Sequence, residues 1–123
     1  MAKILIVEDD SQLQIIYQKK FTKEGHEVYV ATTGQEGLTI AQTKIPDIVL
    51  LDVMLPGGQN GFDVLEQIKR NPALTKIPVL MLTNLDTEQQ TAMSIGASDY
   101  IVKANTSLDN MVNIVNKYLP QTK

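Results

Sequence analysis

One hydrophobic run near the middle of the chain is Asp47-Ile48-Val49-Leu50-Leu51-Asp52, and Val53-Met54-Leu55-Pro56-Gly57-Gly58 follows it. Four consecutive Ile, Val and Leu residues bounded by turn-forming residues are typical of a central parallel strand that is covered on both faces. Asp52 ends the run, and the ligands of open parallel sheets bind at the carboxyl ends of the strands. Aspartate before Pro and Gly more often only closes a turn, so this strand alone leaves the two interpretations of Asp52 equally open.

Four other segments predict strands, at residues 3–7, 27–31, 77–82 and 98–103. Three of them lead into polar residues in the same way. Glu8-Asp9-Asp10 follows the first strand, Thr83-Asn84 follows the fourth, and Lys103 ends the fifth.

Five amphipathic segments alternate with these strands. In the helix that begins at Ser11, we expect one face to carry Leu13, Ile16, Tyr17 and Phe21, and the outward face to carry Gln12, Gln14, Gln18, Lys19 and Lys23. Apolar spacing indicates the other four helices at Leu38, Ile40 and Ala41; at Phe62, Leu65 and Ile68; at Ala92 and Met93; and at Leu108, Met111, Val112, Val115 and Leu119.

Helix ends are indicated by capping residues. Thr33 with Glu36, and Thr87 with Gln90, have the spacing of a capping box at a helix start. Gly25 and Gly96 are expected to end the first and fourth helices.

Five strands that alternate with five helices predict an α/β fold. The favoured form is a flavodoxin-like three-layer sandwich, with a five-stranded parallel sheet in the order 2-1-3-4-5. In that order the first and third strands are neighbours. Glu8, Asp9 and Asp52 would then lie together at one edge of the sheet, and Thr83 and Lys103 would reach the same edge.

Composition restricts the classes of function. The 123 residues are expected to form a single domain over residues 1–123, and the chain contains no cysteine. A net charge of -3 without a cluster of Lys and Arg argues against direct nucleic-acid binding. The apolar runs are too short for a membrane span, so we expect a cytoplasmic protein without membrane contacts.

Crowded carboxylates indicate a cation site. Three acidic side chains at one edge repel each other unless a cation joins them, and hard oxygen ligands suit Mg²⁺. Zinc is disfavoured because the chain has no cysteine and one histidine, His26, which is expected to be a solvated turn residue.

A carboxylate can also act as a nucleophile and form an aspartyl-phosphate, and Asp52 is the candidate. Lys103 would supply a compact cation and Thr83 a hydroxyl to the phosphoryl oxygens. Each residue also has an ordinary structural explanation, such as a helix cap or a solvated strand end. Their occurrence at matching ends of four strands favours the chemical interpretation.

Four motifs in order make the chain closely similar to the response regulator receiver domain of two-component signalling, of the kind found in chemotaxis regulators. The motifs are Lys3-Ile4-Leu5-Ile6-Val7-Glu8-Asp9-Asp10, Asp47-Ile48-Val49-Leu50-Leu51-Asp52-Val53-Met54-Leu55-Pro56, Val79-Leu80-Met81-Leu82-Thr83 and Gly96-Ala97-Ser98-Asp99-Tyr100-Ile101-Val102-Lys103. The resemblance covers essentially the whole chain, and the ordered set is specific where one motif alone would be weak.

The resemblance implies functions for individual residues. Asp52 would accept a phosphoryl group from a histidine kinase or a phosphotransfer protein, and Lys103 would contact that group. Glu8, Asp9, Asp52 and the backbone carbonyl of Met54 would hold Mg²⁺, while Thr83 and Tyr100 would form a switch pair.

The resemblance also implies a regulatory domain rather than an enzyme, although one that promotes its own phosphorylation and dephosphorylation. Its output surface would be the face made by the fourth helix, fifth strand and fifth helix, which would control a downstream protein effector. The implied oligomeric state is a monomer or a phosphorylation-dependent homodimer.

Three positions depart from the family pattern. Ala104 stands where the family has a proline reached through a cis bond, so a trans Lys103-Ala104 bond is expected. The loop Gly57-Gly58-Gln59-Asn60-Gly61 is one residue longer than is common. Asn84 replaces a small residue and, with Met54, borders the path of the hydrolytic water.

Three alternatives use the same residues differently. A Mg²⁺-dependent phosphohydrolase with an aspartyl nucleophile needs a second carboxylate two residues later, where this chain has Met54. A flavin carrier needs a glycine- and hydroxyl-rich phosphate loop where this chain has Glu8-Asp9-Asp10. A degenerate receiver that acts only through protein contacts is disfavoured by the complete acid set.

Overall fold

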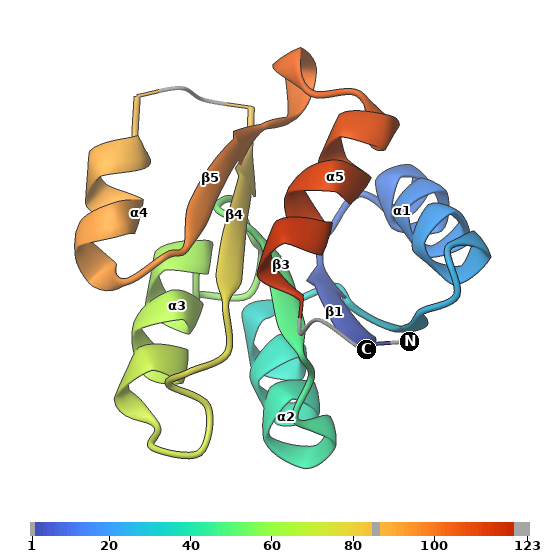
Figure 1. Cartoon of the computed structure of the whole chain (residues 1–123). Helices are drawn as coiled ribbons and strands as arrows, with labels where there is room; N and C mark the ends of the chain where they lie inside the picture. Colours follow the sequence, from blue (N-terminus) through green and yellow to red (C-terminus); the bar gives the residue numbers. More distant parts are fainter. Residues whose placement is uncertain (1, 85–86, 120–123) are drawn as a thin grey trace.

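The hydrophobic run in the middle of the chain forms the central strand of the sheet, and every residue of that strand is buried. A computed structural model of the chain describes residues 2–84 and 87–119. Its strands are β1 Lys3–Val7, β2 Glu27–Ala31, β3 Ile48–Asp52, β4 Val79–Thr83 and β5 Asp99–Val102. All of them pair in parallel, and their order β2-β1-β3-β4-β5 confirms the prediction (Figure 1).

Helices cover both faces of this sheet. They are α1 Ser11–Lys23, α2 Gly34–Lys44, α3 Gly61–Arg70, α4 Gln89–Ile95 and α5 Leu108–Tyr118, with a short 3₁₀ helix, η1 Lys103–Asn105, after β5. Helices α1 and α5 lie side by side on one face, and α2, α3 and α4 cover the other (Figure 1).

Successive strand residues point to opposite faces, and this alternation divides the core in two. On β1, Ile4 and Ile6 pack under α1 and α5, whereas Leu5 and Val7 pack under α2 and α3. The predicted flavodoxin-like sandwich is therefore confirmed, with a hydrophobic core on each side of the sheet.

Side-chain caps explain where several helices begin. Asp10 accepts the N–H groups of Gln12 and Leu13 at the start of α1, and Thr33 accepts the N–H of Glu36 at the start of α2. The carboxylate of Glu36 accepts the N–H of Thr32 instead of that of Thr33, so the predicted capping box of α2 is half formed.

Two helix starts differ from the sequence prediction. Thr87 does not cap α4, which begins at Gln89 after Glu88 and has no side-chain cap. A complete capping box between Asn60 and Asp63, which was not predicted, starts α3. Spacing alone predicts a cap poorly, because the backbone before the helix must also take the extended conformation that Asn60 has.

The outward face of α1 also differs from the prediction. Ile16 was expected on the buried face but is 43% exposed, because α1 rests on the sheet mainly through Tyr17 and Phe21. Gln14, expected to face outward, is half-buried and hydrogen-bonded to the loops at the end of the sheet. Helical periodicity places residues on a face but does not set the width of the buried stripe.

Candidate functional site

The residues that follow the strands converge at the carboxyl end of the sheet. Glu8 follows β1, Asp52 ends β3, Thr83 ends β4 and Lys103 follows β5. They border a hollow of about 230 Å³, lined by Glu8, Asp9, Asp10, Leu13, Asp52, Met54, Thr83, Asn84 and Lys103.

Three carboxylates in this hollow are close enough to share a cation. Glu8, Asp9 and Asp52 each offer an oxygen, and these oxygens lie within 4.8 Å of one another. Glu8 is 1% exposed and Asp52 is 5% exposed, whereas Asp9 opens to solvent. An all-oxygen donor set that is partly open to water fits a hard divalent ion such as Mg²⁺.

Lys103 joins the two buried acids. Its Nζ lies 2.5 Å from Oε1 of Glu8 and 3.0 Å from Oδ2 of Asp52. The other oxygens of these carboxylates accept backbone N–H groups, from Asp10 to Glu8 and from Met54 to Asp52, both at 3.1 Å. Asp52 therefore does close a turn, as its ordinary interpretation requires, and it also faces the hollow.

Burial and proximity shift the protonation equilibria of this group. Burial raises the pKa of Glu8 to about 7, and the neighbouring carboxyl of Asp52 adds to this rise while Lys103 opposes it. For Lys103, burial acts to lower the pKa, but its hydrogen bonds to Glu8 and Asp52 leave the pKa above its usual value. The lysine is thus held as a cation between two acids.

Thr83 and Tyr100 lie on one face of neighbouring strands. Both are buried, and the strand register pairs Thr83 with Val102 and Met81 with Tyr100. Met81 and Tyr100 belong to the core under α2, α3 and α4. Because Thr83 stands two residues after Met81, it points to the same face as Tyr100.

The departures from the family pattern have local structural effects. The Lys103-Ala104 bond is trans, since no peptide bond is cis among residues 2–84 and 87–119, and the chain turns there through η1. Gly57 and Gly58 have φ angles of 88° and 87°, which only glycine adopts easily. Met54 is 65% exposed at the rim of the hollow.

His26 lies apart from these residues, in the turn between α1 and β2. It is half-buried rather than solvated as predicted, and its Nδ1 accepts the N–H of Ala2 at 3.2 Å. Burial lowers the pKa of His26, which favours the neutral ring that this hydrogen bond requires.

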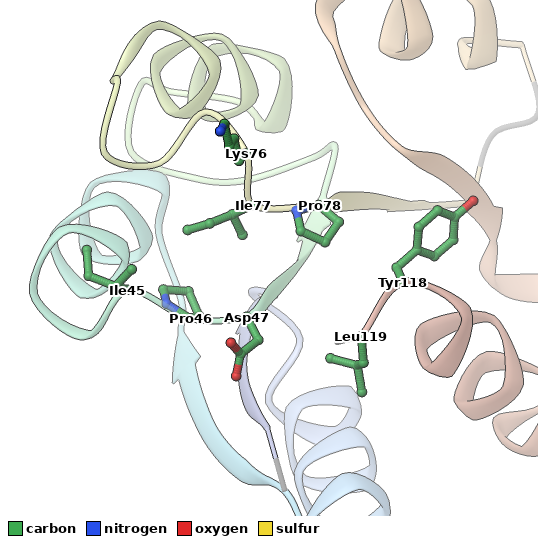
Figure 2. Close-up of a pocket in the computed structure, with 8 residues that line it drawn as sticks. All are labelled: Ile45, Pro46, Asp47, Lys76, Ile77, Pro78, Tyr118 and Leu119. Atoms are coloured by element: carbon green, nitrogen blue, oxygen red, sulfur yellow. The ribbon is translucent and has the colours of Figure 1, made fainter. Parts of the chain in front are cut away.

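A second hollow, of about 430 Å³, opens at the amino end of the sheet (Figure 2). Its lining residues are Ile45, Pro46, Asp47, Lys76, Ile77, Pro78, Tyr118 and Leu119. Asp47 is the carboxylate in this lining, and it accepts the N–H of Lys3 at 2.8 Å. None of the sequence-predicted site residues lines this hollow.

Comparison with known proteins decides the family. Residues 4–116 match the model of the response regulator receiver domain. The chain belongs to this family.

The receiver domain resembles parts of longer proteins. It is 37% identical over 105 residues to the transcriptional regulatory protein AfsQ1 of Streptomyces coelicolor. The matched region covers 84% of this chain and 45% of AfsQ1. It is 38% identical over 104 residues to the response regulator PleD of Caulobacter vibrioides, and the matched region covers 83% of this chain and 23% of PleD. The chain thus spans less than half of the length of each relative.

Solved structures support the same assignment. The receiver domain matches the chemotaxis response regulator CheY4 of Vibrio cholerae with a TM-score of 0.89 and 26% identity, over 97% of this chain and 99% of CheY4. It matches the Mn²⁺-bound form of response regulator Rcp1 with a TM-score of 0.82 and 26% identity, over 98% of this chain and 100% of Rcp1. Within the described part of the receiver domain, no helix has the length and apolar character needed to span a membrane.

Proposed function

We propose that this receiver domain accepts a phosphoryl group on Asp52 from a histidine kinase or a phosphotransfer protein, in a Mg²⁺-dependent reaction. One observation carries the proposal: oxygens of Glu8, Asp9 and Asp52 lie within 4.8 Å of one another, beside the ammonium group of Lys103. A carboxylate nucleophile, a cation site and a fixed lysine in one hollow match the requirements of phosphoryl transfer.

Asp52 is the proposed nucleophile. One of its oxygens attacks the phosphorus of a phosphohistidine, a P–O bond forms and the P–N bond breaks. The departing imidazole keeps the bonding electron pair and takes up a proton. Hydrogen bonds from Met54 N–H and Lys103 Nζ hold the carboxylate of Asp52 in a defined direction, which favours productive attack.

Glu8, Asp9, Asp52 and the backbone carbonyl of Met54 are the proposed ligands of Mg²⁺. When bound, Mg²⁺ neutralises charge on the carboxylates and on the phosphoryl oxygens. Lys103 adds a compact cation, held between Glu8 and Asp52, to balance the charge of a phosphoryl oxygen.

The proposed output is a change of protein surface. The hydroxyl of Thr83 would hydrogen-bond a phosphoryl oxygen, and Tyr100, buried on the same face of the sheet, would respond to the movement of Thr83. A local change of charge would thereby change the shape of the face formed by α4, β5 and α5, which we propose binds a protein effector.

The regulatory role is favoured over steady hydrolysis by the residue at position 54. An aspartyl-nucleophile phosphohydrolase needs a general acid two residues after the nucleophile, and Met54 offers no ionisable group. We therefore propose a regulatory domain that accepts a phosphoryl group, and not an enzyme that turns over a phosphate ester.

Intact-mass measurement after incubation with acetyl phosphate tests the proposal. The wild-type protein is expected to gain one phosphoryl group with Mg²⁺ and none with a chelator, and Asp52→Asn is expected to gain none. Asp47→Asn is the matched control, because it alters the carboxylate that comes directly before the same strand. A folded wild-type protein that gains no phosphoryl group with Mg²⁺, or that gains it equally in Asp52→Asn, would overturn the proposal.

A further inference from the structure

We infer that Gln14 is a positioning residue for the metal-binding carboxylates, which acts by holding the backbone from which Glu8 and Asp9 extend. The inference rests on the proposed Mg²⁺ site and goes beyond it, because Gln14 has no metal-ligand atom in that site.

The side-chain amide of Gln14 links three segments of the chain. Its Nε2 donates to the backbone carbonyl of Glu8, and it lies 3.2 Å from the hydroxyl of Thr32 and 3.3 Å from the carbonyl of Ala31. The carbonyl of Ala31 also accepts the N–H of Glu8 at 2.9 Å. Gln14 therefore connects α1 to the ends of β1 and β2 at the point where the acidic residues begin.

These contacts close a ring around the acidic segment. The N–H of Gln14 donates to the carbonyl of Asp10 at 3.0 Å, and the N–H of Asp10 donates to Oε2 of Glu8 at 3.1 Å. The amide of Gln14 then returns to the carbonyl of Glu8. Glu8, Asp9 and Asp10 are thus held at both ends by hydrogen bonds that do not use the oxygens facing Lys103.

Asp9 depends most on this ring. Hydrogen bonds from Asp10 and Lys103 direct the carboxylate of Glu8, and those from Met54 and Lys103 direct that of Asp52. Within residues 2–84 and 87–119, no comparable hydrogen bond directs the exposed carboxylate of Asp9. The placement of the Asp9 carboxylate therefore depends more on the backbone that carries it than the other two carboxylates do.

Peptide geometry transmits the effect of Gln14 to Asp9. The carbonyl of Glu8 and the N–H of Asp9 belong to one planar peptide group. A hydrogen bond that fixes this carbonyl therefore also fixes the position of the Asp9 Cα, from which the side chain extends. Partners of this kind around a metal site orient the ligands without touching the ion, and their loss commonly weakens metal binding.

The test compares Gln14→Met with Gln18→Met in the whole chain. Methionine keeps the length and helix propensity of glutamine but donates no hydrogen bond. Gln18 lies one turn later on α1 and is exposed, so Gln18→Met controls for the substitution itself. Isothermal titration calorimetry with MgCl₂ measures the dissociation constant, and urea unfolding shows that each variant is folded at the titration temperature.

We expect Gln14→Met to bind Mg²⁺ about tenfold more weakly than wild type, and Gln18→Met to bind it like wild type. In acetyl phosphate reactions, the Mg²⁺ concentration for half-maximal rate should rise by the same factor, with little change in the rate at saturation. A residue that only stabilises the fold would not move the Mg²⁺ dissociation constant of a folded protein.

Three results would count against the inference in distinguishable ways. Equal Mg²⁺ affinity in wild type and Gln14→Met would overturn the role of Gln14 and leave the proposed function standing. Equal weakening in Gln18→Met would trace the effect to α1 as a whole and overturn the specific role. Absence of Mg²⁺ binding by wild type would overturn the proposed site and the inference together. If Gln14→Met does not fold, Gln14→Leu gives the same comparison.

Discussion

The two ends of the parallel sheet differ in chemistry although the same five strands form both. At the carboxyl end, a hollow of about 230 Å³ collects Glu8, Asp9 and Asp52 around Lys103. At the amino end, the hollow of about 430 Å³ is lined mainly by apolar side chains such as Ile45 (Figure 2). Among the residues that the structure describes, the cluster of carboxylates that could hold a cation lies at the carboxyl end.

Helix direction explains much of this difference. Each helix that follows a strand begins at the carboxyl end of the sheet, where free N–H groups and the positive end of the helix dipole favour anions. Asp10 uses two such N–H groups at the start of α1. At the amino end, lysines meet carbonyl groups instead: Lys3 Nζ donates to Lys44, and Lys69 Nζ donates to Ile77 at 2.8 Å. Helix direction in a parallel α/β sheet therefore favours anions at the carboxyl end of the sheet and cations at its amino end, whatever the function of the protein.

Packing at the carboxyl end of the sheet is expected to tolerate substitution less well than packing at the amino end. A methyl group on Gly61 would lie 2.1 Å from the carbonyl oxygen of Asp52 and 2.8 Å from Cα of Val53, so backbone must move to admit it. Gly61→Ala is therefore expected to lower the free energy of unfolding by about 3 kcal/mol, and to impair the proposed phosphorylation of Asp52.

Gly58→Ala is the matched control for Gly61→Ala in urea unfolding. Gly58 has a positive φ, but a methyl group added to it would have no atom within 4 Å beyond its own chain neighbours, so its substitution should cost about 1 kcal/mol from backbone conformation alone. Equal losses for the two variants would show that close approach to Asp52 has no special effect.

Charge at the carboxyl end predicts a pH dependence of stability. Burial and Asp52 raise the pKa of Glu8 to about 7, so the folded protein without Mg²⁺ binds a proton more tightly than the unfolded chain, in which the value is near 4.5. The stabilisation that the folded protein gains from this proton is complete below pH 4.5 and is lost as pH rises through 7. Between pH 5 and 8 the loss should be about 2 kcal/mol.

Glu8→Gln isolates that effect, because glutamine resembles the protonated acid and does not titrate. Urea unfolding in a chelator at several pH values should show the wild type losing stability relative to Glu8→Gln as pH rises. A constant difference between the two proteins from pH 5 to 8 would mean that Glu8 is ionised throughout and that Lys103 compensates its burial fully.

The amino end is expected to tolerate, and even gain from, substitution. Ile45 follows α2 with φ 46° and ψ 70°, a left-handed conformation that is unfavourable for a β-branched residue, and its side chain is 45% exposed. Ile45→Asn should raise the free energy of unfolding by about 1 kcal/mol, since asparagine accepts this conformation readily. A lower urea midpoint for Ile45→Asn would show that Ile45 contributes more through packing than it loses in backbone strain.

Local patterns were sufficient to predict the positions of the strands and most of the helices. The runs that became β1 and β3 were identified by their uninterrupted branched residues. Alternation with helices predicted a parallel sheet, and the favoured flavodoxin-like order is the one observed. The same logic predicted that Glu8, Asp9, Asp52, Thr83 and Lys103 would meet at one edge. Thr87 was misassigned as a cap, because capping depends on backbone conformation as well as on spacing.

By itself, the sequence determined the layered fold, the parallel sheet and the end of that sheet where the acids gather, because these follow from periodicity and chain connectivity. The tertiary structure alone decided which groups touch. Lys103 bonds Glu8 across 95 residues of chain, and Gln14 turns inward to the carbonyl of Glu8. Such contacts depend on the distances and directions that packing sets between segments, and no local pattern in the sequence encodes those.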